Sequence, residues 1–239
     1  MKRNVLQLIG SFNEGGSERQ ALQLARLLKE RGDYQVQLAS LDGRGVLRSE
    51  AERLGFGEAP EFPLTSFYDG NTAKQIRRFA RFLREREIAV VHTHDFYTNV
   101  FGMAGAALAG VPARIASRRE TTGWRTASQR FVERCAYYLA HSVVANAEAV
   151  RTQLISEGVR AEKSVTIYNS LDIERVRSTQ TVRRDEALAS FNLPGGTNIQ
   201  LVTIVANLRH TVKNHPMFLR AALAVSLAVP EARFVVAGE

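Results

Sequence analysis

The feature that most constrains the fold of this chain is a regular alternation of short apolar runs with amphipathic helical patterns. The apolar runs have the length and the β-branched content of buried strands, as at 4–9, 34–41 and 142–145. Helical patterns separate these runs, and the first, at 17–31, keeps its apolar residues on one face. Strands that alternate with helices are typical of βαβ units, so the sequence predicts an α/β fold with a parallel sheet.

A polar stretch without periodicity, at 169–181, predicts a linker between two domains. We therefore place a first domain at 1–170 and assign 171–239 to the linker and a second domain. The second domain shows a helix at 183–191, a strand at 199–205, a helix at 216–228 and a strand at 233–236. Two strands are too few to bury both faces of a parallel sheet, so we expect this domain to be incomplete through truncation, proteolysis or a disrupted gene.

Length and composition restrict the class of protein. The chain has 239 residues, 45% of them hydrophobic and 23% charged, which allows a sizeable core and is typical of a soluble globular protein. No apolar run is long enough to span a bilayer, and Gly10 ends the first run too early for a signal peptide. Cys135 is the only cysteine, which excludes a disulfide framework and favours a cytoplasmic location.

The formal net charge of +8 predicts an anionic partner. Twelve basic and five acidic residues fall between 73 and 134, so nearly all of the excess lies in one quarter of the chain. A cytoplasmic membrane face or a phosphorylated substrate fits this charge. Nucleic acid is not expected as a partner, because no helix-turn-helix, zinc finger or RNA-binding signature accompanies the basic residues.

Many of the basic residues fall in a predicted helix at 72–87. One face of this helix is apolar, and arginines and a lysine line the rest. The pattern is that of a solvated helix packed on a sheet, or of a peripheral contact with anionic lipid headgroups. Phe82, which we place away from the apolar face, favours the membrane contact.

Polar residues begin abruptly in the sequence Val-His-Thr-His-Asp at 91–95, at the end of a predicted strand. Because strand residues alternate faces, His92 and His94 should point the same way, at the sheet edge where parallel sheets bind ligands. The two histidines could satisfy buried hydrogen bonds under a loop, or they could ligate a metal with Asp95. Alternatively, His94 could be a catalytic residue or orient the substrate. The other histidines, which a metal site would need, are scattered at 141, 210 and 215.

A glycine-containing segment at 10–18 precedes the first helix. It matches neither a Walker motif nor a dinucleotide fingerprint. Gly15 and Gly16 let backbone amides approach an anion, and the helix dipole favours negative charge there. We expect Ser17 to cap this helix, with Gln20 completing a capping box.

Further polar residues are expected near the same crevice. A mobile polar loop should begin at Arg118 and face the histidines. Asn146 should cap the helix that follows the strand at 142–145. Arg209 and Lys213 form a second candidate anion site after the strand at 199–205. One anion-binding element from each domain could then grip a diphosphate across a cleft.

Five short motifs occur in the order and spacing of a known family, and together they cover nearly the whole chain. They lie at 14–19, 91–95, 145–150, 169–172 and 206–215. With these motifs the sequence resembles the family-4 glycosyltransferases of GT-B fold. The resemblance implies a Rossmann-like first domain on the acceptor side, with helices on both faces of its sheet, and the beginning of a second Rossmann-like domain on the donor side.

The resemblance also implies a reaction. Members of this family transfer a sugar, with retention of the anomeric configuration, from a nucleotide-sugar donor to an acceptor hydroxyl. For this chain that implies a glycan or lipid-linked acceptor, cell-surface polysaccharide or glycolipid synthesis, and a place in the cytoplasm at the inner face of the membrane. No metal or other cofactor is implied.

Individual roles follow from the matched motifs. Gly15 and Gly16 would lie against the donor diphosphate, and His94 would lie beside the transferred sugar as the catalytic residue. Lys213 would neutralise the leaving diphosphate, a role that a metal plays in other transferases. The segment 169–172 would be the hinge between domains. The remaining substrate-binding residues of this assignment are Ser17, Arg118, Asn146 and Arg209.

The sequence also departs from the family. Asn207 stands where an arginine is usual, so Arg209 would have to supply the second basic contact, and Ser170 and Ala147 replace a usual glycine and serine. The acidic motif that holds the donor's sugar and ribose is missing, so we expect this chain to bind donor poorly and to turn over little or nothing. A non-catalytic binding module acting through its basic surface and a nucleotide-sugar epimerase of GT-B architecture are the alternatives.

Overall fold

The computed structural model describes residues 2–66, 69–121, 125–171, 173, 182–196, 198–206, 208 and 213–238. The chain divides into two compact units, 1–171 and 172–239, and each is described by itself. This division falls one residue from the boundary expected from the sequence. Most of the expected linker at 169–181 lies outside the described residues.

The first unit is built on one six-stranded parallel sheet, in the spatial order β2-β1-β3-β4-β5-β6. Its strands are β1 (Arg3–Ile9), β2 (Tyr34–Ser40), β3 (Ile88–Thr93), β4 (Ala113–Arg118), β5 (Ser142–Ala145) and β6 (Ser164–Thr166). Its helices are α1 (Gly16–Arg31), α2 (Leu47–Arg53), α3 (Gly70–Glu85), α4 (Phe96–Ala109), α5 (Ala127–Leu139), α6 (Glu148–Ser156) and the short 3-10 helix η1 (Ala161–Lys163).

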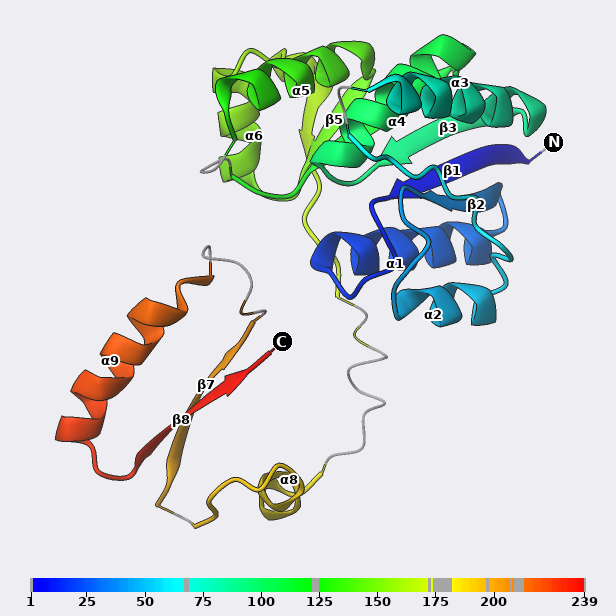
Figure 1. The fold of residues 1–239 in the computed structure, drawn as a ribbon. Helices are drawn as coiled ribbons and strands as arrows, with labels where there is room; N and C mark the ends of the chain where they lie inside the picture. The colour runs from blue at the N-terminus through cyan, green and yellow to red at the C-terminus, as the bar shows by residue number, and fades with distance from the viewer. Residues whose placement is uncertain are drawn as a thin grey trace. The chain divides into compact units, whose positions relative to one another are not determined.

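Helices cover both faces of this sheet (Figure 1), which confirms the predicted α/β class and layer order. Helices α1 and α2 pack on one face, where Ala21 and Ala25 meet Val36 and Leu38 of β2. Helices α3 to α6 contribute to a second core that includes β1, β3, β4 and β5. Strand β1 is second from one edge of the sheet, because the chain adds β2 on one side of β1 and then crosses back to add β3 on the other.

Helix α4 approaches the sheet closely because two of its core positions are glycines. A Cβ atom added to Gly102 would lie 2.5 Å from Thr93 Cγ2 and 2.7 Å from Leu8 Cδ2. One added to Gly105 would lie 2.5 Å from Cδ1 of Phe79 on α3. The glycines therefore set the distance between α4, α3 and the strand that ends at the histidines.

Helix α3 packs through a cluster of aromatic rings, and this corrects the expectation for Phe82. Its ring is half-buried, with centroids 5.9 Å from Phe62 and 6.5 Å from Phe79, so it belongs to the core. The helix also begins earlier than predicted, because Asp69 accepts a hydrogen bond from the backbone N–H of Thr72 and caps it. Phe82 therefore gives no support to a membrane contact of α3.

The second unit contains α8 (Arg184–Ser190), β7 (Gln200–Val205), α9 (His215–Ala228) and β8 (Ala232–Ala237). Strands β7 and β8 pair in parallel from Gln200 opposite Ala232 to Val205 opposite Ala237. The rings of Phe218 and Phe234 pack α9 on β8 with centroids 6.1 Å apart. Across the described ranges of both units, no helix has the length and apolarity needed to cross a bilayer.

The packing of α4 predicts the effect of lengthening one side chain by a single carbon. Gly105→Ala should lower the free energy of unfolding by about 1–3 kcal/mol in chemical denaturation, because the new methyl group collides with Phe79. Gly70→Ala, at the start of α3, is the control, since its Cβ atom would meet nothing within 4 Å. It should leave stability unchanged or slightly raised. Equal effects at the two positions would contradict this description of α4.

Candidate functional site

Polar side chains converge at the carboxyl ends of β1, β3, β4 and β5, the edge where parallel sheets bind ligands. Gln7 lies near the end of β1, and His94 follows β3 directly. Arg119 follows β4, and Asn146 follows β5. The order of the strands therefore assembles this site from segments that are far apart in the sequence.

His94 is held on both sides of its ring. Its Nε2 atom lies 2.7 Å from Gln7 Oε1, and its Nδ1 atom lies 3.2 Å from Nη2 of Arg119. A guanidinium only donates hydrogen bonds, so Nδ1 must accept, and the proton must sit on Nε2 and be donated to Gln7. Burial, with the nearby His92 and Arg119, lowers the pKa of His94 well below its usual value. His94 is therefore a neutral imidazole of one fixed tautomer.

His92 lies behind His94, and the two rings are on the same side of the sheet with centroids 4.3 Å apart. Its Nε2 atom lies 2.7 Å from Oγ of Ser117 on β4. Burial, followed by the charge of Arg119, lowers the pKa of His92 to about 3. His92 thus fits the interpretation of a histidine that satisfies a buried hydrogen bond.

Arg119, which sequence reasoning did not single out, is the arginine that bonds His94. The expected residue Arg118 lines the same small cavity as His94. Arg118 is the last residue of β4, is 1% exposed, and forms an ion pair with Glu157 at 2.5 Å. Residue alternation along β4 turns the next side chain to the other face. Arg119 there donates to Asn169 Oδ1 at 2.6 Å as well as to His94. Of the loop expected at 118–123, residues 122 and 123 lie outside the described part.

Two buried polar atoms at this edge of the sheet have no hydrogen-bond partner among the described residues. They are Nε of Arg119 and Oδ1 of Asn146. Asn146 was expected to cap α6, but Ala147 is at the N-cap, and the Asn146 amide instead donates to the Arg119 carbonyl at 3.1 Å. One donor and one acceptor are therefore left for a ligand at this edge of the sheet.

The glycine segment lies at the start of α1, but the cap differs from the expectation. Gly15 is the N-cap residue, Gly16 and Ser17 are in the first turn, and no side chain caps the helix. Gln20, expected to complete a capping box, instead bonds the backbone of Ser170 twice, at 2.7 and 3.1 Å. The N-cap residue thus provides no side chain to cover the first-turn amides, while the Glu18 carboxyl accepts from its own backbone N–H.

Two carboxyl groups flank the same region. Asp95 caps α4 in a capping box with Thr98, and Glu18 lies in the first turn of α1. Burial raises the pKa of both carboxyl groups, and Asp95 also raises that of Glu18. A Cβ atom on Gly10 would lie 3.1 Å from Oδ2 of Asp95 and 3.9 Å from Oε1 of Glu18, so Gly10 leaves room for both.

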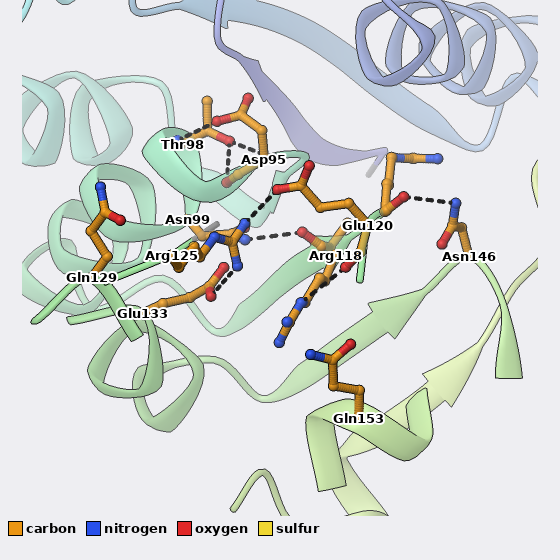
Figure 2. Close-up of polar contacts among 12 residues, drawn as sticks. Asp95, Thr98, Asn99, Arg118, Glu120, Arg125, Gln129, Glu133, Asn146 and Gln153 are labelled. Atoms are coloured by element: carbon orange, nitrogen blue, oxygen red, sulfur yellow. Dashed lines mark hydrogen bonds and ion pairs between the residues drawn. The ribbon is translucent and has the colours of Figure 1, made fainter. Parts of the chain in front are cut away.

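Ion pairs fasten the segment after β4 to α5 (Figure 2). Arg125 bonds Glu120 at 2.8 Å and also pairs with Glu133, and its guanidinium lies 4.9 Å from the Phe96 ring centre. The Tyr137 hydroxyl donates to Glu133 at 2.7 Å. This network holds in place the segment after β4, which includes Arg119 and forms one wall of the site.

The site contains two cavities. A small one of about 110 Å³ is lined by Ser17, His94 and Arg119 among others, so His94 is buried but forms part of a cavity wall. A larger one of about 620 Å³ lies beside Gly10 and reaches Asp95 and the half-exposed Tyr97. In the described ranges, no group of three or more His, Cys, Asp and Glu side chains could hold a metal ion.

The expected cationic pair belongs to the second unit. Arg209 and Asn207 lie outside the described residues. Lys213 is exposed just before α9, which Asn214 caps. Because the two units are described separately, the grip on a diphosphate across a cleft stays a prediction.

Sequence reasoning missed Gln7 and Arg119. A lone glutamine inside the apolar strand 4–9 was a visible signal, because a buried amide needs a partner. Which of the adjacent arginines, 118 or 119, bonds His94 could have been predicted only from the exact residue at which β4 ends.

Comparisons with known proteins agree with this fold. A family described as Glycosyltransferase Family 4 matches residues 14–175. Comparison with curated proteins gives no match. Among solved structures, HepE of Anabaena, crystallised with UDP and glucose, is 18% identical with a TM-score of 0.74, and the match covers 97% of this chain and 60% of HepE. This chain thus spans 60% of the length of that protein.

Two further structures are similar. A glycosyltransferase from Rickettsia africae is 12% identical with a TM-score of 0.69, and the match covers 100% of this chain and 69% of that one. A UDP-GlcNAc 2-epimerase from Neisseria meningitidis, bound to UDP-GlcNAc, is 15% identical with a TM-score of 0.64, covering 98% and 65%. At these identities the matches establish a shared fold.

The buried histidines predict how stability depends on pH. In the folded protein the pKa of His92 is about 3, whereas the ordinary pKa of a histidine, as in the unfolded chain, is 6.5. His92 therefore binds a proton less readily in the folded state than in the unfolded state. Stability therefore falls as the pH is lowered through this window, by up to about 1.4 kcal/mol per pH unit for this residue. In denaturant titrations, the difference between the native protein and His92→Asn should shrink or reverse as pH falls below 6.5. A difference that is constant with pH would contradict the assignment.

Proposed function

This chain belongs to Glycosyltransferase Family 4, and from that premise we propose that it moves a sugar from a nucleotide-sugar donor to an acceptor hydroxyl, with retention of the anomeric configuration. The observation that carries the proposal is the neutral His94, fixed between Gln7 and Arg119 in the wall of a polar cavity. A neutral imidazole of fixed orientation can position sugar hydroxyls without adding charge.

The donor diphosphate would lie at the first turn of α1. Its amides carry no side-chain cap, and the helix dipole favours an anion there. Lys213, and Arg209 with it, would neutralise the leaving nucleotide from the second unit, so that neither a metal nor another cofactor is needed. UDP in the HepE crystals and UDP-GlcNAc in the Neisseria epimerase support a nucleotide-sugar as the ligand of this fold.

The acceptor would occupy the larger cavity beside Gly10. Its wall carries the carboxyl groups of Glu18 and Asp95, the hydroxyl of Thr65, and the ring of Tyr97, which is 53% exposed. Carboxylates accept hydrogen bonds from sugar hydroxyls, and an exposed aromatic ring packs against a sugar face. We propose a glycan or lipid-linked acceptor used in cell-surface polysaccharide or glycolipid synthesis.

We also propose that the protein works in the cytoplasm, at the inner face of the cytoplasmic membrane. The formal charge of +8 supports this location, because anionic lipids attract basic surfaces. Ser17, Arg119 and Asn146 would contact substrate, since each places a polar atom at the edge that holds His94. Arg118, which pairs with Glu157 and also lines the cavity at His94, would lie beside the substrate with them.

The experiment compares two neighbouring histidines. With UDP-glucose as donor and octyl glycosides as acceptors, His94→Asn should lower acceptor-dependent UDP release about a hundredfold, because a positioned hydrogen bond is lost. His92→Asn, a matched change at a ring that does not line the cavity, should change it by no more than about threefold. Calorimetric titration with UDP-glucose measures binding alongside.

Other outcomes separate the alternatives. Sugar epimerisation without any acceptor would favour a nucleotide-sugar epimerase. If no variant binds UDP-glucose and none releases UDP, the transferase proposal is contradicted. That result would favour a non-catalytic binding module. The 239-residue chain could turn over slowly while His94→Asn still lowers UDP release far more than His92→Asn does. That result would agree with both the proposal and the prediction of weak activity.

A further inference from the structure

A groove of about 590 Å³ lies between α5 and the segment from Gly158 to Lys163, which links α6 to β6. We call it the α5 groove. Figure 1 shows α5 and α6 at the end of the sheet far from α1 and α2. Its wall from α5 consists of Phe131, Arg134, Cys135, Tyr137 and Tyr138. None of these residues lines the cavities at His94.

The α5 side of the groove exposes large aromatic side chains. Phe131 is 66% exposed and Tyr138 is 82% exposed. With Cys135, also exposed, they recur at the spacing of a single helix face. Ala136, on the opposite face, is buried in the core, and Tyr137, at the bottom of the groove wall, is buried as well. An exposed aromatic face of this kind marks an interaction surface.

The rim of the groove is positively charged. Arg134 and Arg160 are exposed, and Lys163 bonds the carbonyls of Tyr138 and Ala140 at 3.1 and 2.8 Å. Burial, and then Arg160 and Arg114 nearby, lower the pKa of Lys163, as expected where positive charges crowd together. The acidic residue of this segment, Glu162, pairs with Arg160 at 3.2 Å.

We propose that the α5 groove docks the protein on an anionic lipid bilayer. Exposed aromatic rings next to arginines and lysines match a membrane interface, where rings enter the headgroup region and cations meet lipid phosphates. Helix α3 carries more arginines, but its Phe82 is packed in the core. This inference refines the membrane location proposed above and is independent of sugar transfer, because lipid binding is measured without donor or acceptor.

The single cysteine gives a direct test. Cys135 is exposed in the groove, so a polarity-sensitive fluorophore on its thiol reports the environment there. Its emission should shift to the blue with phosphatidylglycerol vesicles and not with phosphatidylcholine vesicles. The control carries the fluorophore on α3, through Ala73→Cys with Cys135→Ser, and should not shift. Vesicle binding without a shift at Cys135, or with an equal shift on α3, would overturn the proposal.

Matched charge variants give the second test. Arg134→Gln with Arg160→Gln should weaken vesicle binding about 25-fold in sedimentation assays, since each surface arginine contributes roughly fivefold. Phe131→Gln with Tyr138→Gln should weaken it on the order of tenfold. Arg77→Gln with Arg81→Gln removes the same charge from exposed positions of α3 and should have a much smaller effect.

The remaining outcomes count against the proposal. Equal losses in the groove and α3 variants would show nonspecific charge attraction. A concentration-dependent dimer that the Phe131 and Tyr138 changes abolish, with lipid binding unchanged, would make the groove an interface between two copies. Circular dichroism should show all variants folded, because every changed side chain is exposed.

Discussion

The hydrogen bond between His94 of the β3 end and Gln7 of β1 is the interaction on which the site depends. Neither group is stable in a buried place without a partner, so each fixes the other. The bond forms because β1 and β3 are neighbours in register, with Gln7 opposite His92. Arg119 then reaches the free side of the imidazole from β4. The chemistry of the site is thus a consequence of strand order.

Groups of opposite charge lie on different sides of the neutral His94 ring. The guanidinium of Arg119 lies on one side, and the carboxyl groups of Asp95 and Glu18 line the neighbouring cavity. The uncapped amides of α1 add partial positive charge beside Ser17. A ligand with an anionic part and many hydroxyl groups complements such an arrangement, which is the character of a nucleotide-sugar with its acceptor.

Periodic features could be read from the sequence, and features set by distant contacts could not. The bounds of α4 and β5 match their apolar patterns and the turns beside them. The position of Phe82 could not be read, because Phe62, from a segment without regular structure, completes its packing. The choice between Arg118 and Arg119 depends on one residue at the end of β4, which decides the face of every following side chain. The N-cap at Gly15 was not predicted, because Gln20, expected in a capping box, instead bonds Ser170, 150 residues away.

That bond between Gln20 and Ser170 has a mechanical consequence. The amide of Gln20 both gives and takes a hydrogen bond, so it clamps the backbone at the end of the first unit to the helix that begins with the paired glycines. The backbone at Ser170 is therefore held to α1. A displacement of the first turns of this helix would thus displace the end of the first unit, through one side chain.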